Sequence, residues 1–163
     1  MANWTYNGQE IKGINDILPH IDGKPWGFVY MLTLVDKKTK KIKYQYIGKK
    51  NLYSITSKTA TKKEFEANAK SYFKRKKMKN GTWKYYTTVI KESNWKEYLS
   101  SNKYIQANHL KYDILKEILL FSKDDMDLTY REAKEIICNG ALESDYFLND
   151  GVSIRRYGKK IIN

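Results

Sequence analysis

The stretch "WGFVYMLTLVDKKTKKIKYQYIGKK", residues 26–50, decides the fold. Residues 26–36 are rich in β-branched and aromatic side chains and are apolar on both faces, which is typical of a central strand. A polar turn follows, and residues 42–48 return as a second strand, which predicts a hairpin. Two lysines, Lys49 and Lys50, end the stretch, so a buried strand passes directly into a surface suited to an acidic partner.

The middle of the chain predicts one helix and a second hairpin. Residues 61–64 have the capping-box spacing, and the apolar residues that follow share one helical face, so we expect a helix over 62–73. The Asn-Gly pair at 80–81 lies between strand-like runs and predicts a tight turn, because both residues tolerate positive φ. One or two short helices are expected within 94–111.

The last third completes the predicted fold. Residues 112–121 predict a third core strand, and residues 122–138 predict a helix that a Ser122-x-x-Asp125 motif begins, with Cys138 in the core. The resulting order predicts an α+β fold with a small three-stranded sheet, mixed or antiparallel, flanked by helices. We expect one domain over residues 1–163, with a basic hairpin insertion at about 55–92.

The charge of the protein is concentrated in one third of the chain. The whole sequence has 31 Lys and Arg against 18 Asp and Glu, and residues 49–96 alone hold 14 against 3. Because lysines neutralise phosphates and aromatic rings stack on bases, basic charge with 14% aromatic residues favours a nucleic-acid partner. A solvated, disordered lysine-rich loop remains the alternative, although the interleaved aromatic residues argue against it.

Several classes of protein are excluded by the sequence. No apolar run approaches the roughly 18 residues that span a bilayer, and the N-terminus lacks a signal-peptide pattern, so we expect no membrane partner. A single cysteine gives no disulfide framework and no cysteine zinc site, which fits a cytoplasmic setting. The two histidines, His20 and His109, lack metal-site spacing, and no glycine-rich phosphate loop is present, so no small-molecule cofactor is expected.

One carboxylate stands out as chemically informative. Glu132 lies four residues from both Leu128 and Ile136, so all three share one face of the predicted helix. A buried acid has to be paired or metal-bound, and pairing with a lysine at the edge of the core is the alternative to a metal site. A phenol whose pKa nearby cations lower can accept a proton, and a carboxylate together with phosphate oxygens can hold Mg²⁺. These groups suit phosphodiester hydrolysis assisted by one metal ion.

The motifs resemble those of a known family. "GFVY" (27–30) followed by "YIG" (46–48) resembles the paired motifs that name the GIY-YIG nucleases. "YREAKEII" is similar to the family's glutamate helix, "YFLND" (146–150) to its late asparagine segment, and "YIGKK" with "ESNWKEY" to small phage-encoded members. The resemblance implies a DNA endonuclease that nicks or cleaves both strands with one Mg²⁺ or Mn²⁺ ion. It also implies a phage or mobile-element origin, with action in the cytoplasm of a bacterial host.

The resemblance assigns roles to five residues. Tyr30 corresponds to the tyrosine of the first motif and to the general base, and Tyr46 to the tyrosine that orients the attacking water or the phosphate. Gly48 allows a close turn of the backbone beside the site. Glu132 corresponds to the metal ligand, and Asn149 to a late polar residue that supports the site.

Three departures separate this sequence from the family pattern. The first motif reads Phe-Val-Tyr at 28–30 instead of Gly-Ile-Tyr, and the spacer to the second motif is longer than usual. The family also places an arginine soon after the second motif, and residues 49–74 contain none. A lysine stabilises phosphate charge without the bidentate fork of arginine. The candidates for this role are Lys49, Lys50, Lys96 and Arg75.

The expected DNA contacts lie mainly on the basic hairpin. We expect lysines and an arginine to line the DNA, with an aromatic ring on the sugar or bases; these residues are Lys74, Arg75, Lys76, Lys77, Lys84 and either Trp83 or Tyr85. The tail around Arg155 and Arg156 is a further candidate. A non-catalytic nucleic-acid-binding module and a cationic protein that blocks a host partner remain alternatives, and the sequence does not decide between monomer and homodimer.

Overall fold

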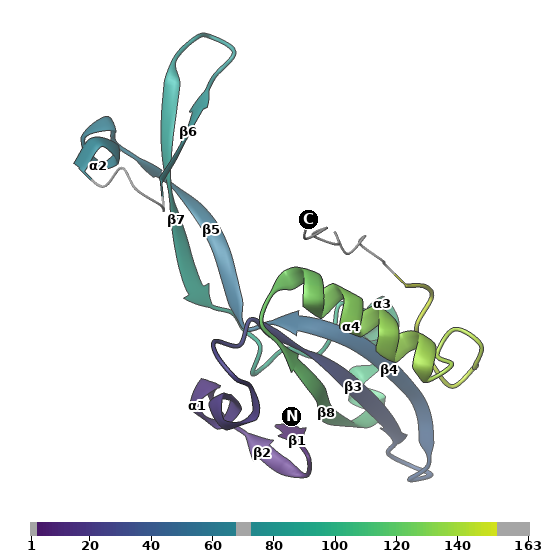
Figure 1. Ribbon diagram of the computed structural model, residues 1–163. Coiled ribbons are helices and arrows are strands. Elements are labelled where there is room, and N and C mark those ends of the chain that lie inside the picture. Colours follow the sequence, from purple (N-terminus) through teal and green to yellow (C-terminus); the bar gives the residue numbers. More distant parts are fainter. Residues whose placement is uncertain (1–2, 68–72, 153–163) are drawn as a thin grey trace, which may run out of the picture. The chain divides into compact units, whose positions relative to one another are not determined.

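The computed structural model describes residues 3–67 and 73–152 and contains two separate β-sheets (Figure 1). The chain divides into two compact units, each with its own sheet. We call residues 1–52 together with 94–163 the core unit, and residues 53–93 the arm unit.

The predicted hairpin and third strand form the centre of the core unit. Strand β3 (Gly27–Asp36) pairs antiparallel with β4 (Ile42–Asn51) on one side and with β8 (Tyr112–Ser122) on the other. Within the first pairing, Tyr30 lies directly opposite Gly48. The hairpin turn of residues 36–41 is held by backbone and side-chain hydrogen bonds to Asp36. The sequence pattern therefore predicted these three strands correctly.

The core sheet has five strands, so the expected three-stranded sheet is wrong. Two short strands at the N-terminus, β1 (Trp4–Tyr6) and β2 (Gln9–Ile11), extend the sheet in the order β2-β1-β8-β3-β4. The pairing of β1 with β8 is parallel, which makes the sheet mixed. Between β1 and β2, Asn7 and Gly8 take positive φ values of 49° and 78°. Asn7-Gly8 is therefore an Asn-Gly turn of the kind that was predicted only at 80–81.

Helix α4 (Asp125–Cys138) begins at a different cap from the one predicted and lies across the core sheet (Figure 1). Asp124, and not the Ser122 motif, is the N-cap, because its side chain accepts a hydrogen bond from the Asp127 N–H. The helix ends at Asn139 as expected. Cys138 is exposed, so its predicted core position is wrong. Its side chain does not lie on the face of the helix that packs against the sheet.

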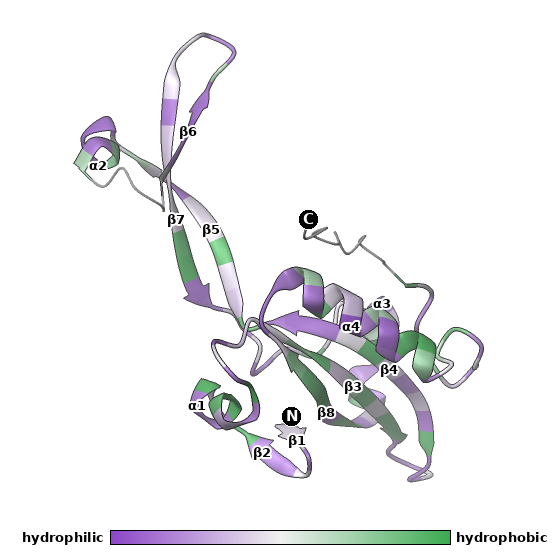
Figure 2. Ribbon diagram, in the orientation of Figure 1, coloured by the Kyte–Doolittle hydropathy of each residue, from purple (hydrophilic) through white to green (hydrophobic). Residues whose placement is uncertain are grey.

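The core unit packs apolar side chains on both faces of its sheet. On the face that α4 covers, Val29 and Ile47 contact Leu128 and Ile136, and all four are buried. On the opposite face, Phe28, Tyr30 and Leu32 lie with Trp4 and Trp95, all at most 1% exposed. Figure 2 shows the corresponding apolar colouring along β3 and β8.

The remaining helices of the core unit are short. They are α1 (Ile14–Ile17), η1 (Leu18–His20), α3 (Lys103–Asn108) and η2 (His109–Lys111). Asn102 caps α3 by accepting hydrogen bonds from two backbone N–H groups, so this helix lies within the range 94–111 where short helices were expected. No helix in the described part of the chain is long and apolar enough to cross a membrane.

The arm unit is a three-stranded antiparallel sheet with the order β5-β7-β6. Its strands are β5 (Tyr53–Ala60), β6 (Phe73–Lys77) and β7 (Trp83–Glu92), and α2 (Lys62–Ala67) follows β5. The helix predicted over 62–73 is therefore too long, because pairing of residue 73 with β7 overrides the helical pattern. In the β6–β7 turn only Gly81 takes a positive φ, of 83°, which corrects the expectation that Asn80 would do so as well.

Candidate active site

Two tyrosines from the paired motifs meet on one face of the core sheet. Tyr30 on β3 and Tyr46 on β4 have ring centroids 6.3 Å apart. Gly48, opposite Tyr30, makes this approach possible: a Cβ atom at this position would lie 2.6 Å from the Tyr30 hydroxyl and 2.9 Å from the Tyr46 ring. Both distances are too short for any side chain, so glycine is required here for steric reasons.

Burial keeps both phenols in their neutral form. Tyr30 is 1% exposed, and burial raises the pKa of its phenol well above the ordinary value of 10. Burial, and then the negative charge of Glu132, also raise the pKa of the half-buried Tyr46 phenol. The expectation that nearby cations lower the pKa of a catalytic phenol is therefore wrong for the protein alone, because desolvation has the largest effect on both phenols and raises their pKa.

The glutamate of α4 forms an ion pair with the first lysine after the second motif. Lys49 Nζ lies 3.4 Å from Glu132 Oε2 and also donates a hydrogen bond of 2.6 Å to Thr129 Oγ1. The Glu132 side chain is 18% exposed, and burial raises the pKa of its carboxyl, although Lys49 offsets part of this rise. Thr129 and Glu132 are three residues apart on one face of the helix, so both side chains contact the Lys49 ammonium.

The second lysine lies over an aromatic ring. Lys50 Nζ is 4.0 Å from the centroid of the Tyr98 ring and donates a 2.8 Å hydrogen bond to Asn94 Oδ1. Burial lowers the pKa of the Lys50 ammonium. The Tyr98 ring also packs edge-on against Tyr30, at 6.2 Å between centroids. The Tyr98 ring therefore contacts both the Lys50 ammonium and the ring of Tyr30.

Asn149 holds the free edge of β4 beside the site. Its Oδ1 accepts a hydrogen bond from the Ile47 N–H at 3.0 Å, and its Nδ2 donates one to the Ile47 carbonyl at 2.8 Å. The backbone of residues 146–148 bonds to Gln45 in the same way, so this segment runs along β4 like a short strand. Asn149 therefore fixes the backbone between Tyr46 and Gly48.

A sequence profile described as "Putative endonuclease segE, GIY-YIG domain" matches residues 4–152, which is most of the chain. The chain belongs to this GIY-YIG family. No curated protein and no solved structure gave a significant match. The resemblance inferred from the paired motifs is thereby confirmed.

Nucleases of the GIY-YIG family generally use a divalent metal, and the donor set here fits such an ion. No three His, Cys, Asp or Glu side chains come together anywhere in residues 3–67 and 73–152, which argues against an ion held by protein ligands alone. A single carboxylate at a partly open site suits Mg²⁺, which keeps several waters and binds phosphate oxygens. Glu132 offers that carboxylate, and Lys49 supplies its counter-charge in the metal-free protein.

The other predicted residues of this GIY-YIG protein have the following surroundings. Lys96 is exposed, with its ammonium 5.6 Å from the Trp95 ring centroid. Arg75 belongs to the arm unit, where its guanidinium lies 4.7 Å from the centroid of the Trp83 ring. The other arm residues of the prediction are exposed or half-buried there: Lys74, Lys76, Lys77, Lys84 and Tyr85. Arg155 and Arg156 lie outside the described residues.

Sequence reasoning missed the groups that surround the two tyrosines. Tyr98 and Ser100 lie close enough to the Tyr30 phenol to influence its pKa, and Ser100 and Ser101 do the same for the Tyr46 phenol. The available signal was the run "YLSSN" at 98–102, which places three hydroxyl groups before a capped helix. Thr129 was missed as well, although its spacing of three residues from Glu132 was visible.

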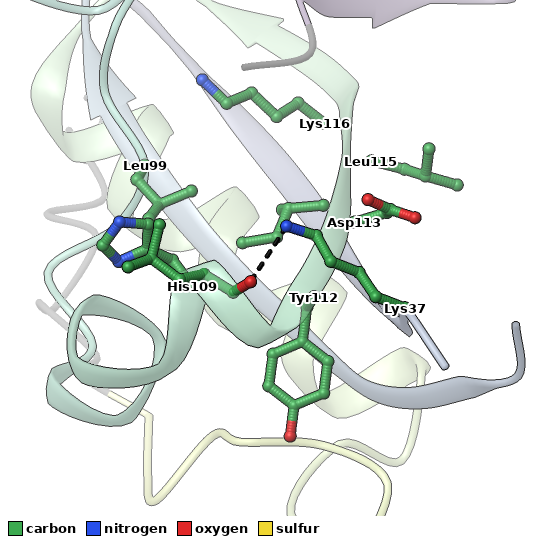
Figure 3. Close-up of a pocket in the computed structure, with 9 residues that line it drawn as sticks. Lys37, Leu99, His109, Tyr112, Asp113, Leu115 and Lys116 are labelled. Atoms are coloured by element: carbon green, nitrogen blue, oxygen red, sulfur yellow. Dashed lines mark hydrogen bonds between the residues drawn. The ribbon is translucent and has the colours of Figure 1, made fainter. Parts of the chain in front are cut away.

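A pocket of about 460 Å³ in the core unit is separate from these residues (Figure 3). Lys37 crosses it and donates a 2.9 Å hydrogen bond to the Leu110 carbonyl. Lys116 also lines the pocket, and its ammonium donates a 2.9 Å hydrogen bond to the Tyr98 carbonyl. The pocket therefore contacts the segment that supports the site, but it contains none of the predicted catalytic side chains.

Proposed function

We propose that this protein is a DNA endonuclease that hydrolyses phosphodiester bonds with one Mg²⁺ or Mn²⁺ ion held by Glu132. The observation that supports this best is the meeting of both motif tyrosines at Gly48, with the Lys49–Glu132 ion pair near enough for the carboxylate to raise the pKa of Tyr46. When bound, the ion would stabilise the negative charge that develops on the scissile phosphate.

The side chains of the site supply positioning and proton transfer. Tyr46, half-buried and coupled to Glu132, orients the attacking water or the phosphate. Tyr30 accepts the proton of the water as a phenolate, after its own phenolic proton has been released to solvent in the DNA-bound state. Lys50 takes the place of the family's arginine, because its ammonium lies over the Tyr98 ring, which packs against Tyr30, and it forms no salt bridge with the described carboxylates. Lys49 would be the second phosphate ligand, because a cation held by Glu132 would take over the counter-charge that Lys49 now supplies.

The arm unit supplies the DNA grip in this proposal. Residues 53–93 hold eleven basic against three acidic side chains, so this unit attracts a phosphate backbone strongly. We further propose that the enzyme nicks or cleaves specific sites, that a phage or mobile element encodes it, and that it acts in the bacterial cytoplasm.

A plasmid-cleavage assay with and without Mg²⁺ tests the proposal. Supercoiled DNA should become open-circular if one strand is cut and linear if both are cut, and EDTA should prevent either product. Absence of any product in Mg²⁺ or Mn²⁺, with duplex binding intact, would favour the second candidate, a non-catalytic DNA-binding module. The full burial of Tyr30 and the missing early arginine are the observations that support that candidate.

A further inference from the structure

The strands of the arm unit separate its basic residues into two faces. Side chains alternate across a strand, and directly opposed residues share a face. Opposed pairs in the β6–β7 register include Arg75 with Tyr85 and Lys77 with Trp83, which puts these four on one face. We call it the aromatic face. The other face, which we call the lysine face, carries Lys74, Lys76, Lys84 and Tyr86.

The aromatic face is already engaged within the arm unit. The Phe65 ring of α2 packs on Tyr85 at 4.8 Å between centroids, and the Arg75 guanidinium lies over the Trp83 ring. Helix α2 also brings acidic groups to this face. Two hydrogen bonds from Thr61 lower the pKa of Glu64, and the positive charge of Lys58 lowers it further to a smaller extent. Lys58 lies on the aromatic face, because it is opposite Thr87.

The lysine face has unbalanced charge. Lys76 lies directly opposite Lys84, and Lys74 is two residues along the same strand, so three exposed ammonium groups share one patch. None of the described acidic side chains forms a salt bridge with any of the three. Like charges directly opposite one another destabilise an antiparallel pair, so this arrangement is unfavourable in the protein alone.

Hydroxyl groups continue the lysine face along the sheet. Tyr86 lies opposite Thr59, and Thr88 lies opposite Ser57, all on the face that carries Lys84. Lysine ammonium groups and hydroxyl groups are among the main donors to phosphate oxygens in protein–DNA interfaces. A two-stranded antiparallel ribbon also has the width that the DNA major groove admits.

We propose that the lysine face, centred on Lys76 and Lys84 with Lys74 and the hydroxyl row beside them, binds the phosphate backbone of duplex DNA. The aromatic face is an internal support for the ribbon and does not contact the DNA. The choice of duplex DNA as ligand rests on the proposed endonuclease function. The phosphates supply the counter-charge that the opposed lysines lack.

Two double variants with equal charge change test the proposal. K76Q/K84Q removes two charges from the lysine face, and K58Q/K77Q removes two lysines from the aromatic face without touching the Arg75–Trp83 pair. Binding of the full chain to a mixed-sequence duplex is measured in EDTA over a salt series. K76Q/K84Q should weaken binding at least about tenfold and lower the log-log salt slope by roughly 2, whereas K58Q/K77Q should change the slope by less than about 0.5.

Equal losses in the two variants, a larger loss in K58Q/K77Q, or no duplex binding by the unmodified protein would overturn the proposal. Circular dichroism of both variants checks that the ribbon is intact, and a K76A/K84A pair replaces K76Q/K84Q if the latter fails to fold. Because binding is measured without metal, its outcome is independent of cleavage. A protein that binds through Lys76 and Lys84 but never cuts DNA would refute the endonuclease function alone.

Discussion

Four residues of β3, Phe28, Val29, Leu32 and Leu34, are fully buried, whereas no described residue of the arm unit is buried. The contacts that hold the arm unit include strand pairing, the Phe65 ring on Tyr85 and the Arg75 guanidinium on Trp83. Figure 2 shows the same contrast, with apolar colour concentrated in the core sheet and polar colour along β6.

The contrast matches what each unit is proposed to do. Catalysis needs reacting groups held to within a fraction of an ångström, and only side chains packed in a dense interior are positioned so well. A grip on the phosphate backbone needs charge of the right sign and spacing, because its strength comes mainly from counterion release. A small solvated sheet is sufficient for that purpose. Three substitutions and one deletion test this difference between the two units.

Replacing Glu132 by Gln should have the largest effect. The change removes the fixed ligand of the metal, so we expect turnover to fall at least about a thousandfold, which corresponds to about 4 kcal/mol of barrier. Metal-free binding of duplex DNA should be unchanged, because the arm supplies the grip. Glu135→Gln, on the same helix, is the matched control and should cleave normally. A Glu132→Gln protein that cuts DNA in Mg²⁺ would contradict the site.

Replacing Tyr30 by Phe should lower turnover about a hundredfold or more with the fold preserved. Burial places the pKa of the Tyr30 phenol above 10, so the reactive phenolate fraction should increase tenfold per pH unit below that pKa. The wild-type rate should therefore rise between pH 7 and 9, and the rate of Tyr30→Phe should not. Tyr112→Phe, another buried tyrosine, serves as control. A flat wild-type profile would mean that the neutral phenol only donates a hydrogen bond.

Replacing Gly48 by Ala should destabilise the core unit by about 1–3 kcal/mol, because the new methyl group overlaps the Tyr30 hydroxyl. Urea unfolding measures the loss, and cleavage should fall with it as the phenol is displaced. Gly13→Ala, where a Cβ atom meets nothing within 4 Å, is the control. Full stability and activity in Gly48→Ala would show that the two rings move apart easily and that the cluster is not rigid.

Removing the arm unit should have the smallest effect on the core. Ser54 and Lys91 are opposed in the β5–β7 ladder, so an Asn-Gly turn in place of residues 55–90 closes the chain without strain. We expect the melting temperature of the core to change by only about 2–4 °C or less, which corresponds to less than about 1 kcal/mol. Duplex affinity should fall strongly. Loss of the folded core would contradict the separation into two units.

The sequence by itself determined the features that depend on neighbouring residues. The β-branched and aromatic residues of 26–36 and 42–48, with a polar turn between them, predicted the hairpin, and the helical periodicity around Glu132 predicted a carboxylate on the sheet-facing side of α4. The concentration of charge in 49–96 was also plain from composition. Such signals arise within one or two turns of helix or a single hairpin, where backbone geometry alone fixes which side chains share a face.

Only the tertiary structure decided the contacts between distant segments. The bond of Asn149 to Ile47 spans 102 residues, the pairing of Lys49 with Thr129 spans 80, and the parallel pairing of β1 with β8 brings in a strand that the pattern did not predict. The high pKa of the Tyr30 phenol also depends on distant segments, because aromatic rings from other parts of the chain bury it. Local periodicity carries no information on which distant segment covers a side chain, since that depends on how the whole core packs.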